Sequence, residues 1–544
     1  IYSILWDFAG QSVYYVTHPL FLTRRAIYFL VYDLSRNPSD KATPLMKQGV
    51  YKAFNADEYN LKTNFDYLDF WMSSLAALAD PEMVLPFKKF PAVFLVCTHA
   101  DQPYCDHNPF KLASEIFGDL KNKPYGAHLF DVFCVDNTKS GTESECKEIM
   151  RLRAKVHVVS KELPHVIEPI PIKWLKYENA LRALKESDHK FISLSTAKKI
   201  AAKFCNINDH EVQTVLTFLH DLRVLIHFDD SPELNELVFL DIQWLIDVFK
   251  SVITVRAYAV ERDFAPLWEE LEKKGILKES LLKHVWNSLV PQRETHESLF
   301  AIMEKFSLMC PWPSSDDLCN KHYLVPSMLR LFPSERISNL VDSAQLPSLF
   351  LKFDTGRVPP GLFPRLVLEF FQWCRKEFPD VDLPKPYRNF ARFYIFPNQG
   401  LSLVLLCHSS TIEVVVLSVK SAIDVVDVES IRAFRNQLTL IIDRVWKKFF
   451  WVKNIRCEVS YLCPVCSHGR VASFCPQHHE ESCKQEECLH FILESDLLNK
   501  KQVVCTNSVT ALDNRIHAEQ FAPWISSGKE KVGKMFFSWY ELVT

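Results

Sequence analysis

The sequence has 544 residues, which at ~100–200 residues per domain correspond to three or four folding units. Its hydrophobic fraction of 48% and aromatic fraction of 13% exclude a disordered polymer. The 63 basic and 66 acidic residues leave a formal net charge of −3, which argues against a nucleic-acid-binding protein. No apolar run reaches the ~20 residues that a bilayer requires, and residues 1–11 lack a signal-peptide pattern. We therefore expect a cytoplasmic protein without a transmembrane segment.

The first part of the chain, residues 1–165, alternates short apolar runs with longer amphipathic stretches. The runs, rich in Val, Ile, Phe and Tyr, predict strands at 1–6, 26–32, 91–98 and 130–136. The amphipathic stretches between them predict helices, including 64–79 and 111–121. This alternation is typical of an α/β domain with a mostly parallel sheet, whose ligands bind at the carboxyl ends of the strands.

The second part, residues 166–328, changes to helices at 174–185, 195–204 and 244–253, with strand-like pieces at 224–228 and 237–240. This order predicts a winged-helix-like unit, and the balanced charge favours protein contact over DNA. The third part, residues 329–544, predicts a mixture of helices and antiparallel strands. A hairpin is expected from 402–407 and 411–418, and a long helix at 428–449 shows one apolar stripe. The stripe consists of Ile431, Phe434, Leu438, Ile441, Val445 and Phe449.

A first cluster of polar residues follows the predicted strand at 1–6. Asp7 could hold a magnesium-bound water, and Gly10 would let its backbone N–H approach a terminal phosphate without a Cβ clash. Gln11 stands where a side-chain amide can orient an attacking water. Taken alone, an Asp-x-x-Gly sequence after a strand is as typical of an ordinary turn.

Two later strand ends carry complementary chemistry. After the strand at 91–98, Thr98, His99 and Asp101 could read guanine, with the carboxylate of Asp101 accepting two hydrogen bonds from the base. After the strand at 130–136, the run Asn137, Thr138 and Lys139 could close over the other side of the base. We expect Asp7 and Asp101 to lie on neighbouring strand ends that open onto one cleft.

This order of motifs resembles the later motifs of Ras-like GTPases, and the residues within the motifs are similar to those of the Roc domain of Roco proteins. The resemblance implies that Asp7 and Gly10 face magnesium and the γ-phosphate, and that Gln11 positions water. It also implies that Thr98, His99 and Asp101 bind the base, with Asn137, Thr138 and Lys139 nearby. The fold implied for residues 1–165 is therefore a partial P-loop GTPase-like domain that binds GTP or GDP with magnesium.

The sequence departs from this family at its beginning. A Gly-x-x-x-x-Gly-Lys-Ser/Thr phosphate loop does not occur, and neither the first strand nor the first switch is present. Those groups supply most phosphate contacts, so we expect GTP hydrolysis in a full-length parent protein and little or no activity in this chain alone. A truncated sequence explains the departure better than an evolved half-domain does.

The resemblance continues into the COR region that follows Roc, an α+β region. It is carried by residues 174–175, 218–222, 242–245, 323–327 and 360–363, although Arg223 stands where the family frequently has Gly. Trp174, Trp244 and Phe363 are best interpreted as core residues. Because COR regions act mainly in dimerisation and coupling, the resemblance implies a homodimer and signalling partners.

The sixteen cysteines fall into two groups. Most of them lie in apolar segments of the sequence and are expected to be buried thiols; examples are Cys97, Cys134, Cys205 and Cys407. A dense Cys/His cluster at about 457–507 instead suggests a structural zinc site in an inserted loop. Its members are Cys463, Cys466, Cys475, His478, His479, Cys483, Cys488 and His490. We favour Cys463, Cys466, Cys483 and Cys488 as ligands; a redox pair and plain thiols are the alternatives.

The sequence therefore predicts a regulatory GTP-binding core that couples nucleotide state to COR-mediated dimerisation. The alternative is a protein-interaction scaffold whose guanine-nucleotide domain is vestigial.

Overall fold

The chain folds into two compact units, which are described separately. The first comprises Ile1–Glu270 and Ile276–Val325, and the second comprises Leu271–Gly275 and Pro326–Thr544. The computed structural model describes residues 5–8, 21–42, 45–48, 52–55, 63–78, 84–85, 88–139, 141, 146–163, 166, 168–229, 231–253, 262–290, 295–312, 321–344, 346–354, 356–359, 361–378, 385–395, 400–418, 428–448, 455–473, 475, 483, 486–500, 502–507 and 514–525.

A three-stranded parallel sheet forms the centre of the N-terminal part of the first unit. Its order is β1 (Ile27–Asp33), β6 (Ala92–Thr98) and β7 (Leu129–Cys134). These strands confirm the strands predicted at 26–32, 91–98 and 130–136. Alternate side chains of β6 point to opposite faces of the sheet, and both faces are buried, which accounts for its uninterrupted apolar sequence.

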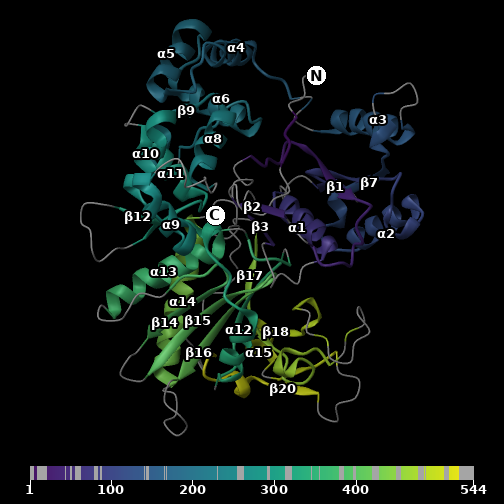
Figure 1. The fold of residues 1–544 in the computed structure, drawn as a ribbon, viewed down its shortest axis with the longest axis vertical. Coiled ribbons are helices and arrows are strands. Elements are labelled where there is room, and N and C mark those ends of the chain that lie inside the picture. Colours follow the sequence, from purple (N-terminus) through teal and green to yellow (C-terminus); the bar gives the residue numbers. More distant parts are fainter. Residues whose placement is uncertain are drawn as a thin grey trace. The chain divides into compact units, whose positions relative to one another are not determined.

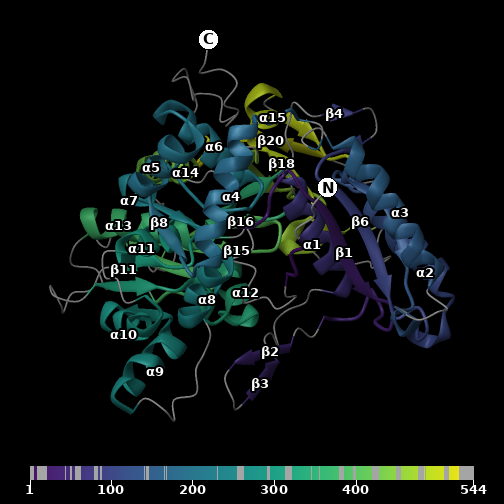
Figure 2. The same cartoon turned by 90° about the horizontal axis from the view of Figure 1, so that it is seen from above.

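Helices cover the two faces of this sheet. One face packs on α1 (Asn64–Ala76) and α2 (Pro109–Lys121), and the other packs on α3 (Lys147–Glu162). Helix α1 lies along β1 (Figure 2). Its first turn is fixed by a capping box between Thr63 and Asp66. The short pairs β2 (Leu45–Gln48) with β3 (Lys52–Asn55) and β4 (Val84–Leu85) with β5 (Lys88–Lys89) are antiparallel.

The strand predicted at 1–6 is not seen in its described part. Leu5–Phe8 has no regular secondary structure, and residues 1–4 lie outside the described residues. A strand persists only when its backbone groups find a ladder partner. In the described sheet β1 pairs only with β6, so its other edge carries no described strand.

The remainder of the first unit is mostly helical. The region that we expected to be winged-helix-like contains α5 and α6 packed with the antiparallel pair β8 and β9. The strand expected at 224–228 is reduced to one bridge between Ile226 and Phe239. A second small antiparallel sheet has the order β10-β12-β11. The elements are α4 (Ile172–Glu186), β8 (Phe191–Ser193), α5 (Leu194–Cys205), α6 (Asp209–Asp221), α7 (Pro232–Asn235), β9 (Leu237–Phe239), α8 (Ile242–Ile253), α9 (Ala265–Lys274), β10 (Ile276–Lys278), α10 (Glu279–Leu289), α11 (Thr295–Lys305), β11 (Cys310–Trp312) and β12 (His322–Leu324).

The second unit is built on a six-stranded antiparallel sheet (Figure 1). Its strand order is β14 (Phe390–Ile395), β15 (Leu401–Cys407), β16 (Thr411–Ser418), β13 (Leu349–Phe353), β17 (Cys457–Leu462) and β18 (Phe491–Leu493). On one face, α13 (Leu362–Glu377) and α14 (Val428–Lys448) pack through aromatic side chains. On the other face lies α12 (Ser334–Asp342). The unit ends with α15 (Glu494–Lys500) and the pair β19 (Gln502–Val504) and β20 (Arg515–His517).

Two predictions for this unit are confirmed. Strands β15 and β16 form the expected hairpin around residues 408–410. Helix α14 buries the apolar stripe at Ile431, Phe434, Leu438, Ile441 and Val445, while Phe449 lies outside the described residues. None of the helices in the described part of the chain is long and apolar enough to cross a membrane.

Candidate functional site

The carboxyl ends of β6 and β7 form one edge at which the predicted base-reading residues lie. The ladder between the two strands continues beyond their last residues, because Val135 N–H donates to the Cys97 carbonyl at 2.7 Å and Ala100 N–H donates to the Val135 carbonyl at 3.2 Å. The loop that carries Thr98, His99 and Asp101 is thereby held beside the loop at 137–139. The structure thus brings these two predicted motifs together.

The first of these loops is also tied to the end of β1. The Thr98 hydroxyl donates to the Tyr32 carbonyl at 3.2 Å. His99 has a left-handed φ of 57°, and its Nδ1 lies 3.1 Å from the Asp33 carboxylate while half of its side chain remains exposed. A histidine tolerates this backbone conformation better than a β-branched residue does. The loop therefore presents an imidazole to solvent above a fixed carboxylate.

Asp33 is a site residue that the sequence reasoning missed. Partial burial opposes its charge, but hydrogen bonds from the Ser35 hydroxyl and N–H and the charges of His99 and Arg36 hold its pKa below the usual range. The available signal was its position, since Asp33 directly follows the strand predicted at 26–32 and, as the last residue of β1, lies at the same sheet edge.

The second loop is organised around Asp136, which is largely buried. Its Oδ1 accepts hydrogen bonds from the Thr138 N–H at 3.0 Å and from the Thr138 hydroxyl at 2.5 Å, and its Oδ2 lies 2.9 Å from Lys139 Nζ. These bonds lower the pKa of Asp136 and raise that of Lys139. The charge of Asp101 makes a smaller contribution in the same direction to the pKa of Lys139. The carboxylate of Asp101 is itself exposed.

The residues predicted to face magnesium and phosphate are only partly described. Asp7 is exposed, between Trp6, which stacks on Phe21 at 5.9 Å between ring centroids, and Phe8, which packs against the core beneath α1 and α2. Gly10 and Gln11 lie outside the described residues. Their roles, and the shared cleft of Asp7 with Asp101, remain predictions.

Of the cysteines expected to be buried thiols, Cys97, Cys134 and Cys205 are buried, while Cys407 is half-buried. The dense Cys/His cluster divides differently from the ligand set predicted from the sequence. Cys463 and Cys466 lie with His490 and Cys505, whereas Cys483 and Cys488 lie with Cys475. Within each group the candidate ligand atoms lie within 4.8 Å of one another. His478 and His479 lie outside the described residues.

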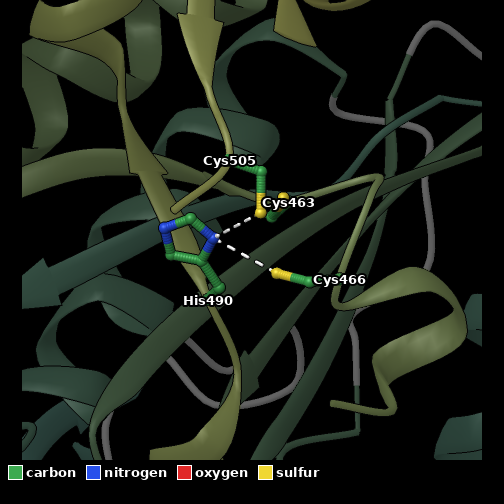
Figure 3. Close-up of side chains that lie close together, drawn as sticks. All are labelled: Cys463, Cys466, His490 and Cys505. Carbon is green, nitrogen blue, oxygen red and sulfur yellow. Dashed lines mark hydrogen bonds between the residues drawn. The ribbon is translucent and has the colours of Figure 1, made fainter. Parts of the chain in front are cut away.

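The first of these groups offers a complete set of four metal ligands. His490 Nδ1 lies 3.2 Å from Cys466 Sγ and 3.6 Å from Cys505 Sγ, and the imidazole faces all three thiols (Figure 3). Burial raises the pKa of the Cys466 thiol and lowers that of His490. Cys505 is absent from the predicted set because it lies 39 positions after Cys466 in the sequence, directly after β19.

Comparison with known proteins connects these features to one family. A family model described as "C-terminal of Roc, COR-A domain" matches residues 171–329. A probable serine/threonine-protein kinase, pats1 of Dictyostelium discoideum, is 25% identical over 397 residues, which cover 69% of this chain and 10% of the relative. The probable serine/threonine-protein kinase roco6 of the same organism is 26% identical over 315 residues, which cover 57% of this chain and 12% of the relative.

Among solved structures, the GDP-bound RocCORdC fragment of Methanosarcina barkeri Roco2 is 19% identical, with a TM-score of 0.37. The match covers 60% of this chain and 79% of that chain. The chain thus spans only about a tenth of the length of the two kinase relatives. From the COR-A match and these relatives, we conclude that the chain belongs to the Roco family and is a Roc-COR region.

Proposed function

We propose that this chain is the guanine-nucleotide-dependent regulatory core of a larger Roco protein. The observation that carries the proposal is the single sheet edge at which Asp101 and Lys139 stand on loops joined by backbone hydrogen bonds. A carboxylate held there can accept hydrogen bonds from the N1–H and N2–H groups of guanine, each worth ~1.5–3 kcal/mol because the acceptor is charged. The aliphatic stem of Lys139 and the exposed ring of His99 would cover the faces of the base.

The phosphate end of the nucleotide belongs to the same proposal. By resemblance to the family, Asp7 would hold a magnesium-bound water, the Gly10 N–H would approach the γ-phosphate, and Gln11 would orient the attacking water. The phosphate loop and its lysine would come from a longer parent protein. On the sheet face opposite α1 and α2, Phe29 is 42% and Val31 is 59% exposed, which supports further structure beside β1 in that parent.

A direct physical link supports coupling between the nucleotide-binding part and the COR-A domain. Arg223, just after α6, donates to the Leu22 carbonyl at 2.7 Å and to the Phe21 carbonyl at 3.2 Å. The Thr23 hydroxyl donates to the Asp221 carbonyl at 2.9 Å. Through these bonds, displacement of the segment before β1 would move the end of α6. We propose that the COR region transmits such changes to a homodimer and to signalling partners in the cytoplasm.

The base-reading assignment can be tested with a parent protein extended upstream to include a phosphate loop. We expect magnesium-dependent binding of GDP and GTP, which Asp101→Asn weakens by about tenfold or more. The same variant should gain affinity for xanthine nucleotides, since an amide offers one acceptor for N1–H and one donor for the xanthine C2 carbonyl. Asp106→Asn, an exposed carboxylate in the same loop, is the matched control.

Two outcomes would overturn this proposal. If the extended protein bound no guanine nucleotide in the presence of magnesium, the scaffold alternative would replace it. If Asp101→Asn bound guanine nucleotides as well as the control, Asp101 would not be the base-reading residue. A zinc ion in the Cys/His cluster is the remaining part of the proposed cofactor set, and its ligands are considered below.

A further inference from the structure

Two backbone ladders, β17–β18 and β19–β20, end where Cys463, Cys466, His490 and Cys505 meet. Cys463 follows the last residue of β17, and its N–H donates to the carbonyl of His490, which immediately precedes β18, at 2.9 Å. Cys505 follows β19, and its N–H donates to the Asn514 carbonyl at 2.7 Å. Strand ladders therefore position Cys463, His490 and Cys505, and the turn closed by the Ser467 N–H bond to the Cys463 carbonyl carries Cys466. Such support is what a metal site requires.

The distances within this group fit a tetrahedral zinc ion. With Zn–S bonds of ~2.3 Å and a Zn–N bond of ~2.0–2.1 Å, the sulfur and nitrogen ligands of one zinc stand about 3.6 Å apart. The measured Sγ to Nδ1 distances of 3.2 Å and 3.6 Å from His490 to Cys466 and Cys505 lie close to this value. The same nitrogen of His490 faces both sulfurs, as one shared metal ion would require (Figure 3).

The ligand atoms are enclosed and held by neighbouring groups. The backbone N–H groups of Val465 and Cys466 donate to the sulfur of Cys463. Cys463 is fully buried, and Cys466 and Cys505 are 3% and 1% exposed. The Ser467 hydroxyl accepts the His490 N–H at 2.8 Å and so fixes the backbone of the fourth ligand. Such supporting hydrogen bonds around the ligands are typical of structural metal sites.

Two residues that lie between Cys466 and His490 in the sequence, Arg470 and Glu486, contact the β15–β16 hairpin. Glu486 accepts hydrogen bonds from the N–H groups of Ser409 at 2.9 Å and Ser410 at 3.1 Å, and from the Thr411 hydroxyl at 2.8 Å. Arg470 pairs with Glu413, a fully buried carboxylate of β16. Arg470 lies four residues after Cys466, and Glu486 lies four residues before His490. A metal ion that fixes these two ligands therefore also restrains both contacts with the hairpin.

We propose that Cys463, Cys466, His490 and Cys505 bind one zinc ion and that this ion holds Arg470 and Glu486 in contact with the β15–β16 hairpin. The site is independent of nucleotide binding, so its test does not depend on the function proposed above. Without the metal, the described contacts of Arg470 and Glu486 with the hairpin would lose the restraint at the neighbouring ligands. The hairpin turn would then open more often, because local opening is governed by few remaining interactions.

Metal content of the full chain, purified without chelators, tests the ligand assignment. We expect Cys505→Ser and His490→Ala each to lose one zinc equivalent relative to the unsubstituted chain. Cys374→Ala, which removes a buried thiol on α13, and His517→Ala, which removes an exposed imidazole on β20, should lose none. Equal zinc content in the ligand variants and the controls would overturn the proposal.

Two measurements on the unsubstituted chain keep the test informative if a ligand variant fails to fold. Cobalt(II) added to chelator-treated protein should give the absorption of a tetrahedral site with thiolate ligands. Hydrogen exchange at the Ser409 and Ser410 amides should accelerate about tenfold or more after zinc removal and slow again when zinc is restored. Absence of thiolate absorption would refute the zinc site. Unchanged exchange at both amides would refute the proposal that the zinc ion holds Arg470 and Glu486 on the hairpin.

Discussion

Replacement of Arg470 by glutamine removes one of three polar partners of the buried Glu413 carboxylate, the others being His408 and Ser348. Glu413 is fully buried, and His408 Nε2 lies 2.9 Å from its Oε2 while Arg470 pairs with its Oε1. Burial would raise the pKa of Glu413, but the hydrogen bond from His408 and the charges of Arg470 and His408 hold it below the usual range. The carboxylate is therefore charged at neutral pH and depends on these partners.

The expected cost lies between that of a buried and that of a surface ion pair. Removing one partner from a buried pair costs about 3–5 kcal/mol, whereas an exposed pair contributes at most about 1 kcal/mol. The Arg470 side chain is 24% exposed, and His408 remains in place after the substitution. We therefore expect Arg470→Gln to lower the free energy of unfolding of the second unit by about 2 kcal/mol.

Urea unfolding followed by tryptophan fluorescence measures this difference. Lys447→Gln, which removes an exposed i,i+4 pair with Asp443 on α14, is the control and should cost no more than about 0.5 kcal/mol. Because the folded-state pKa of Glu413 is depressed, its contribution is present above the usual glutamate pKa and is lost as the pH falls through the folded-state value. The difference should therefore narrow below about pH 4. An Arg470 variant as stable as the control at pH 7 would refute the reasoning.

Three further substitutions test other contacts. Leu438→Ala on α14 should destabilise the second unit by about 2–5 kcal/mol in thermal unfolding, and an unchanged midpoint would contradict its place in the core. Arg223→Gly keeps the left-handed backbone at φ 57° but removes the bonds to the carbonyls of Phe21 and Leu22, so amide exchange near those residues should accelerate; equal exchange would argue against the link. Cys475→Ser should remove a zinc equivalent bound by the second cysteine group, and unchanged metal content would show that this group holds none.

The elements of this fold were predictable where one periodicity governs a long segment. The apolar stripe of α14 predicted a helix because residues three and four apart in the sequence face the same core. Strand β6 was predictable because a strand that is buried on both faces is apolar throughout. The strand expected at 224–228 failed because only Ile226 finds a ladder partner there. Apolar sequence makes burial likely, but pairing is decided by neighbours that lie elsewhere in the chain.

The metal ligands illustrate the same limit more sharply. The Cys-x-x-Cys turn at Cys463 and Cys466 is local, because a tight turn alone places two sulfurs on one side. The third and fourth members of the group depend on which strand ends meet. His490 joins them because β18 pairs with β17, and Cys505 joins them because the β19–β20 ladder ends at the same place. Proximity in sequence therefore favoured Cys483 and Cys488, which the fold groups with Cys475 instead.

The sheet edge proposed to bind the nucleotide was easier to predict from the sequence than the metal ligands, and the reason is topological. Parallel strands that are neighbours in a sheet place all their carboxyl ends at one edge, so Asp101 and the loop at 137–139 had to meet once β6 and β7 paired. The same rule brings Asp33 to this edge through β1. It does not extend to Asp7, because Leu5–Phe8 is not part of the described sheet.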